Sequence, residues 1–180
     1  TGLAPIFQLA KTPGRTGPFA LGCNILLPFS NRISGGGFWH DGRFHALEPN
    51  VPGSRLPIHG NAFQERWTVF DVTEDRASLE LNSQGPGPFR YHAELACALE
   101  GGALRMNLTL RNTAGSSLPY GAGFHPWFVR TPATRLTMRA AGFWSEDAEH
   151  LPLAFVPDGT EPDFTFTRGG NLPARWINNA

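Results

Sequence analysis

One short segment holds the residues best suited to chemistry in this chain, Gly121-Ala122-Gly123-Phe124-His125-Pro126-Trp127-Phe128. His125 supplies an imidazole, a group that exchanges a proton near neutral pH. Trp127 and Phe128 offer flat apolar faces of the kind on which the C–H face of a sugar ring can rest. The two glycines lack a Cβ, so a ligand can approach the backbone closely. The segment predicts a sugar site, while a strand end with core aromatics fits the same residues about equally well.

Two upstream segments add polar groups. An apolar run from Asn24 stops at Ser30-Asn31-Arg32, and Pro57-Ile58-His59-Gly60-Asn61 follows further along the chain. Arg32 presents a fixed positive fork of donors that suits adjacent hydroxyls, and Asn31 adds a donor and an acceptor. Taken singly, each segment is better explained as a turn with a surface charge. Their order and spacing relative to His125 favour one shared site.

The complete series resembles the aldose 1-epimerase family, which comprises the galactose mutarotases and their hexose-phosphate relatives. It runs from Asn31-Arg32-Ile33 through a Gly-rich hairpin ending at Asn50, then Ile58-His59-Gly60 with Trp67 soon after, to the His125 segment. The resemblance covers roughly residues 24–128. It implies an all-β fold, a large twisted antiparallel β-sandwich, and a reaction that interconverts the α and β anomers of a free aldose. That reaction requires neither a cofactor nor a metal.

The resemblance also implies roles for single residues. His125 corresponds to the general acid at the ring oxygen, His59 and Arg32 to groups that position the sugar, and Asn31 to a neighbour of the site. A family aspartate that binds sugar hydroxyls has its place near Trp176-Ile177-Asn178-Asn179, where Asn178 stands instead. The predicted site therefore has two catalytic residues, His125 and His59, and four substrate-binding residues, Arg32, Asn31, Trp127 and Asn178.

Two departures from the family pattern concern the ends of the chain. Family members carry a strand or more ahead of the first apolar run and a catalytic glutamate on a strand near the C-terminus. The expectation is therefore a sandwich incomplete at both ends and without its general base. The late carboxylates Glu146, Glu149 and Glu161 lie in stretches typical of solvated turns, so none is assigned as the base. Residues 1–180 alone are expected to be a poor catalyst and to associate through unpaired sheet edges.

Composition agrees with an all-β protein. The sequence has many glycines and prolines, fourteen phenylalanines and almost no uninterrupted helical period. Its 180 residues are enough for one domain with a sizeable core, so a single domain covering 1–180 is predicted. The net charge is zero, which gives no long-range field for nucleic acid or an anionic membrane. No apolar run approaches the roughly 20 residues of a membrane helix, and no signal-peptide pattern begins the chain. We expect a cytoplasmic protein that binds a monosaccharide; its oligomeric state stays open.

Strand patterns are clear in the first two thirds of the sequence. Residues 37–47 predict a hairpin around Asp41-Gly42, a turn pair that tolerates positive φ. Residues 67–72 and 78–82 form the next expected pair. The cleanest alternation lies in residues 91–99 and 104–110, separated by Gly101-Gly102, and predicts a long hairpin with one buried and one solvated face. This hairpin leads directly to the His125 segment.

Three functional hypotheses remain open at this stage. The preferred one is a mutarotase-like isomerase acting on a free hexose. The second is a non-catalytic carbohydrate-binding β-sandwich, and the third is a structural sandwich whose polar segments are only loops. A hexose-6-phosphate epimerase is a variant of the first; it requires further cations at the phosphate, for which Arg43, Arg55 and Arg66 are candidates.

Overall fold

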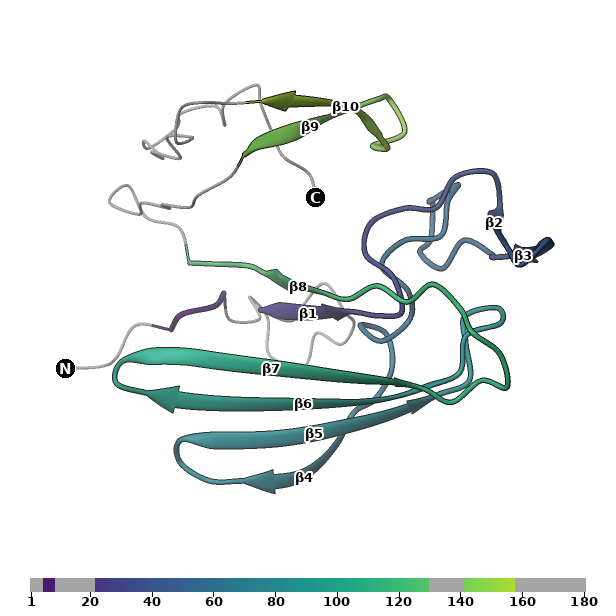
Figure 1. The fold of residues 1–180 in the computed structure, drawn as a ribbon. Helices are drawn as coiled ribbons and strands as arrows, with labels where there is room; N and C mark the ends of the chain where they lie inside the picture. The colour runs from purple at the N-terminus through teal and green to yellow at the C-terminus, as the bar shows by residue number, and fades with distance from the viewer. Residues whose placement is uncertain (1–4, 9–21, 130–140, 158–180) are drawn as a thin grey trace. The chain divides into compact units, whose positions relative to one another are not determined.

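A computed structural model describes residues 5–8, 22–129 and 141–157, and all its regular elements are strands (Figure 1). This confirms the all-β prediction. The part of the chain that the structure describes has no helix that could span a membrane. In chain order the strands are β1 Cys23–Leu26, β2 Gly37–His40, β3 Arg43–Ala46, β4 Thr68–Val72, β5 Arg76–Ser83, β6 Tyr91–Glu100, β7 Ala103–Asn112, β8 Gly123–Pro126, β9 Gly142–Glu146 and β10 Pro152–Pro157.

The chain divides into two compact units. The first comprises Thr1–Asn24 together with His125–Ala180, and the second comprises Ile25–Phe124. The strands form one four-stranded sheet in the order β4-β5-β6-β7 and three two-stranded sheets, β2-β3, β9-β10 and β1-β8. A single domain over residues 1–180 stays a prediction.

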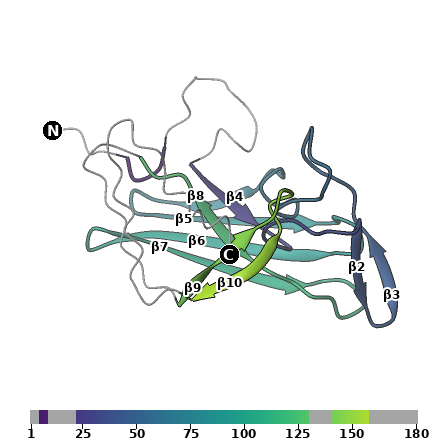
Figure 2. The ribbon, with the colours of Figure 1, turned by 90° about the horizontal axis from the view of Figure 1, so that it is seen from above.

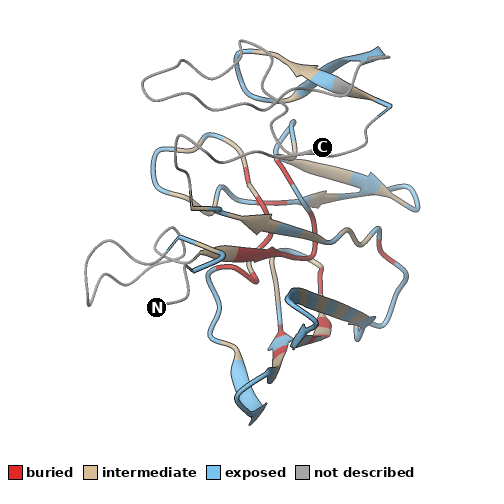
Figure 3. Cartoon of the chain, turned by 90° about the vertical axis from the view of Figure 1, so that its left-hand side faces the viewer, coloured by how far each residue is buried: buried red, intermediate tan, exposed pale blue. Residues whose placement is uncertain are grey.

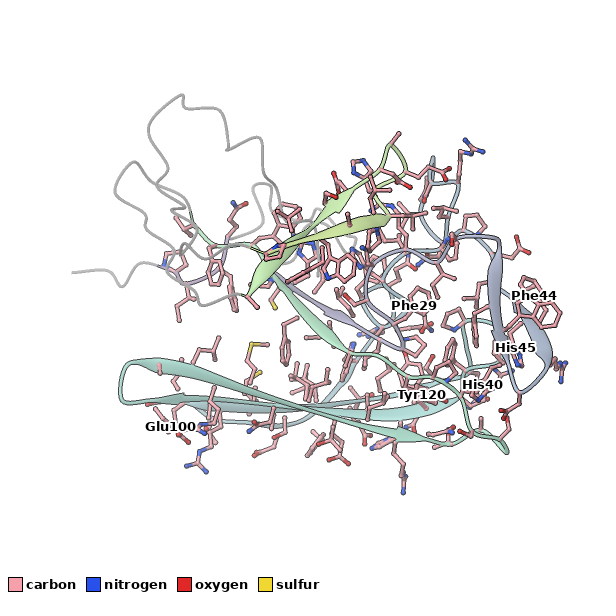
Figure 4. The ribbon with its side chains drawn as sticks, turned by 45° about the horizontal axis from the view of Figure 1, so that its top comes forward. Phe29, His40, Phe44, His45, Glu100 and Tyr120 are labelled. Carbon is pink, nitrogen blue, oxygen red and sulfur yellow. The ribbon has the colours of Figure 1, made fainter. Side chains whose placement is uncertain are left out.

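The four-stranded sheet is the framework of the second unit. Its strands are antiparallel, with Leu79 opposite Leu95 and Leu95 opposite Leu108. The predicted long hairpin is confirmed as β6 and β7, and Gly101 and Gly102 both have positive φ at its turn. In Figure 4, Glu100 lies at this turn, and its carboxylate pairs with the Arg105 guanidinium at 3.3 Å.

One face of the sheet carries the core, as the alternation along β6 predicts. Tyr91, Ala93 and Leu95 are buried and alternate with more exposed residues. Figure 3 shows the buried residues of the chain in red. The residues that complete this core come from β1, from the chain after it and from loops. They are Ile25, Leu27, Phe29, Leu47, Ala62, Phe89 and Leu118. Burial of apolar side chains stabilises this packing by roughly 25 cal/mol for each Å² removed from water.

The β2–β3 hairpin is anchored by aromatic stacking at one end of the sheet, away from the β6–β7 turn (Figure 2). Asp41 and Gly42 have φ of 49° and 72°, which confirms the predicted two-residue turn. Phe38 stacks on Phe89 with ring centroids 5.5 Å apart. The other face of the hairpin carries Trp39, which is 72% exposed.

The first unit contains a smaller hairpin made by β9 and β10. The two strands are antiparallel, and Trp144 of β9 contacts Phe155 of β10 edge to face, with centroids 5.5 Å apart. Both rings are substantially exposed.

A buried hydrogen bond ties the sheet to the loop that follows His59. The Tyr91 hydroxyl donates to Asn61 Oδ1 at 2.8 Å, and Tyr91 is 1% exposed. Tyr91→Phe removes the donor and leaves the Asn61 Oδ1 acceptor without this hydrogen bond, so we expect the free energy of unfolding to fall by about 1–3 kcal/mol. Urea unfolding at pH 7 measures the loss. Tyr120→Phe is the control, because its hydroxyl is less buried; equal losses in both variants would contradict the expectation.

Alkaline pH should weaken the same contact. Burial raises the pKa of the Tyr91 phenol above its ordinary value of about 10. The unfolded chain then loses the proton first, so the stabilising contribution is complete below about pH 10 and declines as the pH rises further. Between about pH 10 and 12, the free energy of unfolding should decrease more steeply for the wild type than for Tyr91→Phe. Parallel curves of urea midpoint against pH would rule this linkage out.

Candidate functional site

Two segments of the second unit that are far apart in sequence pair closely at the predicted sugar-positioning residues. Residues 31–33 run antiparallel to residues 57–59. The Ile33 amide donates to the Pro57 carbonyl at 3.2 Å, and the His59 amide donates to the Asn31 carbonyl at 2.9 Å. Arg32 forms the bridge position opposite Ile58. The structure therefore brings together three of the predicted site residues: Asn31, Arg32 and His59.

The ring of His59 takes part in the same pairing. Its Nδ1 lies 3.1 Å from the Asn31 amide nitrogen, which donates to it. An imidazole nitrogen that accepts an N–H bond carries no proton, so the neutral ring has its hydrogen on Nε2. His59 is 7% exposed, and the edge of its ring meets Phe63 at a centroid distance of 6.1 Å. The backbone therefore selects one tautomer of this histidine.

The pairing requires an uncommon backbone conformation. Asn31 and His59 both have φ of 62°, and Gly60 has φ of 66°. Left-handed residues other than glycine cost about 1–3 kcal/mol each and persist where the surroundings hold them. A Cβ on Gly60 would collide with the Leu27 carbonyl, so glycine is required at this position. The Leu27 carbonyl in turn accepts bonds from the amides of Asn61 and Ala62, at 2.9 and 3.2 Å.

Two buried polar atoms beside this pairing have no partner among the described residues. They are Oδ1 of Asn31 and Nη1 of Arg32, an acceptor and a charged donor on adjacent residues. Asn31 as a whole is 8% exposed. Buried polar groups are nearly always hydrogen-bonded, and an orphan in a native fold often marks a place for water, an ion or a ligand. A sugar hydroxyl both donates and accepts, so its chemistry suits either atom.

The first unit contains the other predicted catalytic histidine. His125 lies on β8, is half-buried, and stacks on Trp127 with ring centroids 5.3 Å apart and planes 26° from parallel. The Trp127 backbone is fixed on both sides, since its amide donates to the Gly22 carbonyl at 2.7 Å and its carbonyl accepts from the Gln8 amide at 2.6 Å. These bonds fix the backbone of Trp127, and stacking on its indole restrains the His125 ring.

The aromatic residues after His125 are not core residues. Trp127 is 43% exposed and Phe128 is 48% exposed, although Phe128 also contacts Phe7 at a centroid distance of 5.8 Å. Their exposure disfavours the alternative of a strand end with buried aromatics. It leaves ring surface available to a ligand.

The two glycines before His125 lie beside the chain that leads to Asn31. A Cβ on Gly121 would lie 3.6 Å from the Phe29 Cα, and one on Gly123 would lie 3.4 Å from the Ser30 Oγ. The Gly121 amide also donates to the Pro28 carbonyl at 2.7 Å. Both Cβ distances are ordinary contact distances, so neither position requires glycine on steric grounds. Close approach of a ligand to this backbone stays a prediction.

The remaining predicted residues have different outcomes. Asn178 and Glu161 lie outside the described residues. Glu149 is exposed in a turn, as expected. Glu146 differs from the expectation, because it ends strand β9, lies 2.8 Å from Nδ1 of His150 through Oε1, and has a buried Oε2. Convergence of Arg32, His59 and His125 on one concavity stays a prediction.

Sequence reasoning missed the polar side chains that support His59. Asn50 and Gln64 bond to the backbone around it, and Asn61 joins it to the sheet. The Gly-rich hairpin ending at Asn50 was part of the recognisable series, but asparagine in a loop gives no signal for what its amide contacts. In residues 5–8, 22–129 and 141–157, no three His, Cys, Asp or Glu side chains gather in a group that could hold a metal ion.

Comparison with known proteins agrees with the sequence resemblance. A sequence model of the aldose 1-epimerase family matches residues 11–180. The chain is 31% identical over 157 residues to the uncharacterized protein YphB of Escherichia coli K12, covering 87% of this chain and 53% of YphB. It is 26% identical over 108 residues to the uncharacterized protein YihR of the same organism, covering 58% of this chain and 35% of YihR.

A solved structure shares the fold. A crystal structure from Escherichia coli K12 described as a "Putative aldose 1-epimerase" matches with a TM-score of 0.81 and 31% identity, over 97% of this chain and 59% of that one. The match confirms the predicted antiparallel β-sandwich. The chain spans about half the length of YphB and about a third of YihR. With the family match over residues 11–180, these findings show that the chain belongs to the aldose 1-epimerase family.

Proposed function

We propose that the protein is an isomerase that interconverts the α and β anomers of a free hexose by acid/base ring opening. A base takes the proton of the anomeric hydroxyl while an acid protonates the ring oxygen. The ring opens, the C1–C2 bond rotates, and the ring closes from the other face. Family membership supports this reaction class; the hexose as substrate is our proposal.

The orphaned polar pair beside His59 is the observation that carries the proposal. Arg32 Nη1 offers a charged donor and Asn31 Oδ1 an acceptor, both buried and both without a partner among the described residues. Hydroxyls of a sugar can satisfy such atoms, whereas a purely structural loop would leave both without a hydrogen bond. Asn178 is proposed as a further ligand of the hydroxyls.

His125 is the proposed acid, because an imidazole near its neutral-pH transition can both donate and recover the proton at the ring oxygen. The exposed face of Trp127 is the proposed platform for the apolar face of the sugar. No described carboxylate is assigned as the base. A non-catalytic sugar-binding protein would use the same contacts without the proton transfers.

Substitution at the acid should separate rate from binding. We expect His125→Ala to lower kcat for anomer interconversion by about 10²–10⁴-fold, because proton transfer to the ring oxygen matters chiefly in the transition state. The KM should change little. Polarimetry with freshly dissolved α-glucose and α-galactose, using the complete protein, measures both constants. A wild-type protein that binds sugar without turnover would instead indicate the non-catalytic alternative.

Substitution at the arginine should act mainly on binding. Arg32 is proposed to hold hydroxyls in both the ground state and the transition state, so Arg32→Ala should raise KM by roughly tenfold or more while kcat changes less. The same polarimetry gives the result, with Arg105→Ala as control, since Arg105 pairs with Glu100 at the β6–β7 turn. If both variants showed the same decrease in kcat and the same increase in KM, these roles would be overturned.

A further inference from the structure

The Asn50 side chain forms hydrogen bonds to the backbone on both sides of His59. Its Nδ2 donates to the carbonyl oxygens of Ile58 and Gly60, at 2.8 and 2.6 Å, and its Oδ1 accepts from the Ile58 amide at 2.8 Å. An asparagine amide has two hydrogens and one oxygen, so these bonds use all of its groups. The half-buried Asn50 therefore holds the backbone on both sides of His59.

Gln64 fixes Asn50 in turn. The Gln64 Nε2 donates to the Asn50 backbone carbonyl at 2.7 Å, and its Oε1 lies 3.2 Å from Asn50 Nδ2. The backbone N–H of Gln64 donates to the backbone carbonyl of Asn61 at 2.8 Å. These bonds link Gln64 to both Asn50 and the turn at His59. The exposed Gln64 thus supports the clamp from outside.

The clamp opposes a relaxation that would otherwise be favourable. His59 has φ of 62°, and release from the left-handed region would recover about 1–3 kcal/mol. Such a release would also carry the ring away from the Asn31 amide, which donates to Nδ1 at 3.1 Å. Once Nδ1 loses that donor, either nitrogen can hold the proton of the neutral ring.

We propose that Asn50 is a positioning residue that keeps His59 in one neutral tautomer, with Nδ1 accepting from Asn31 and the proton on Nε2. Protonation at Nδ1 would set two N–H groups against each other, so His59 acts as a hydrogen-bond donor through Nε2 and not as a proton carrier. The tautomer follows from this geometry alone; that Nε2 serves a sugar rests on the proposed function.

The first test reads the tautomer without any assay of activity. Nitrogen-15 NMR of the histidine rings is recorded at pH 7 on the complete protein, and the His59 signals are identified by their loss in His59→Gln. The wild type should show one unprotonated Nδ1 and one protonated Nε2. In Asn50→Ala the chemical shifts of both His59 ring nitrogens should move towards the average of the protonated and unprotonated values. An unchanged His59 spectrum in a folded Asn50→Ala variant would overturn the proposal.

Asn112→Ala is the matched control. Asn112 also bonds the backbone through both ends of its amide, donating to the Ser116 carbonyl at 2.9 Å and accepting from the Ala114 amide at 2.8 Å. None of its partners lies in residues 31–33 or 57–61. A general loss of stability would affect both variants, whereas only Asn50→Ala should alter the His59 signals. The same alteration in Asn112→Ala would contradict a specific role.

The second test separates this proposal from the proposed function. Where polarimetry shows turnover, Asn50→Ala should raise KM by about three- to tenfold with a smaller change in kcat, as for one weakened hydrogen bond to the substrate. If the wild type has no turnover while the NMR response is as expected, the proposed function fails and the positioning role stands. Turnover with no change in KM or in the His59 spectrum would refute the positioning role.

Gln64→Ala keeps the test decisive if Asn50→Ala does not fold. The side chain is exposed, so its loss should be tolerated while Asn50 loses its outer support. The His59 signals should then move in the same direction as in Asn50→Ala, by a smaller amount. Signals identical to those of the wild type would count against the clamp.

Discussion

The exchange between Asn31 and His59 is the constraint on which the candidate site depends. Each residue supplies a backbone group to the other, and the His59 ring completes the exchange by accepting the Asn31 amide. Both residues are left-handed, so the arrangement stores an unfavourable backbone energy that other contacts must offset. Because Arg32 itself forms the bridge opposite Ile58, its position follows from the same pairing.

The offsetting contacts come from the rigid part of the second unit. The Leu27 carbonyl, fully buried in the core, accepts the amides of Asn61 and Ala62. The Trp67 indole donates to the Ala62 carbonyl at 3.0 Å, and Tyr91 on β6 bonds to the Asn61 side chain. Strain at the site is thus opposed by hydrogen bonds anchored in a packed sheet, where rearrangement would cost core packing as well.

The fold was more predictable from sequence than the site. Period-2 alternation in residues 91–99 and 104–110 depends only on which face is buried, and the Asp41-Gly42 turn follows from local φ preferences, so both were found correctly. The partnership of Asn31 with His59 spans 28 residues and depends on left-handed φ values, which even Asn and His adopt at only a small fraction of positions. The glycines before His125 lie beside Phe29 and Ser30, a tertiary contact that the sequence does not indicate.

The two histidines differ in what their surroundings allow. His59 is buried, and one of its ring nitrogens is occupied by a backbone donor, so gaining a second proton would require breaking the pairing that orients Arg32. His125 is half-buried and stacks on the Trp127 ring. Under the proposed function, proton transfer therefore falls to His125, and His59 contributes orientation. Aldose ring opening needs this division, because a group that holds the sugar must stay fixed while another changes its charge.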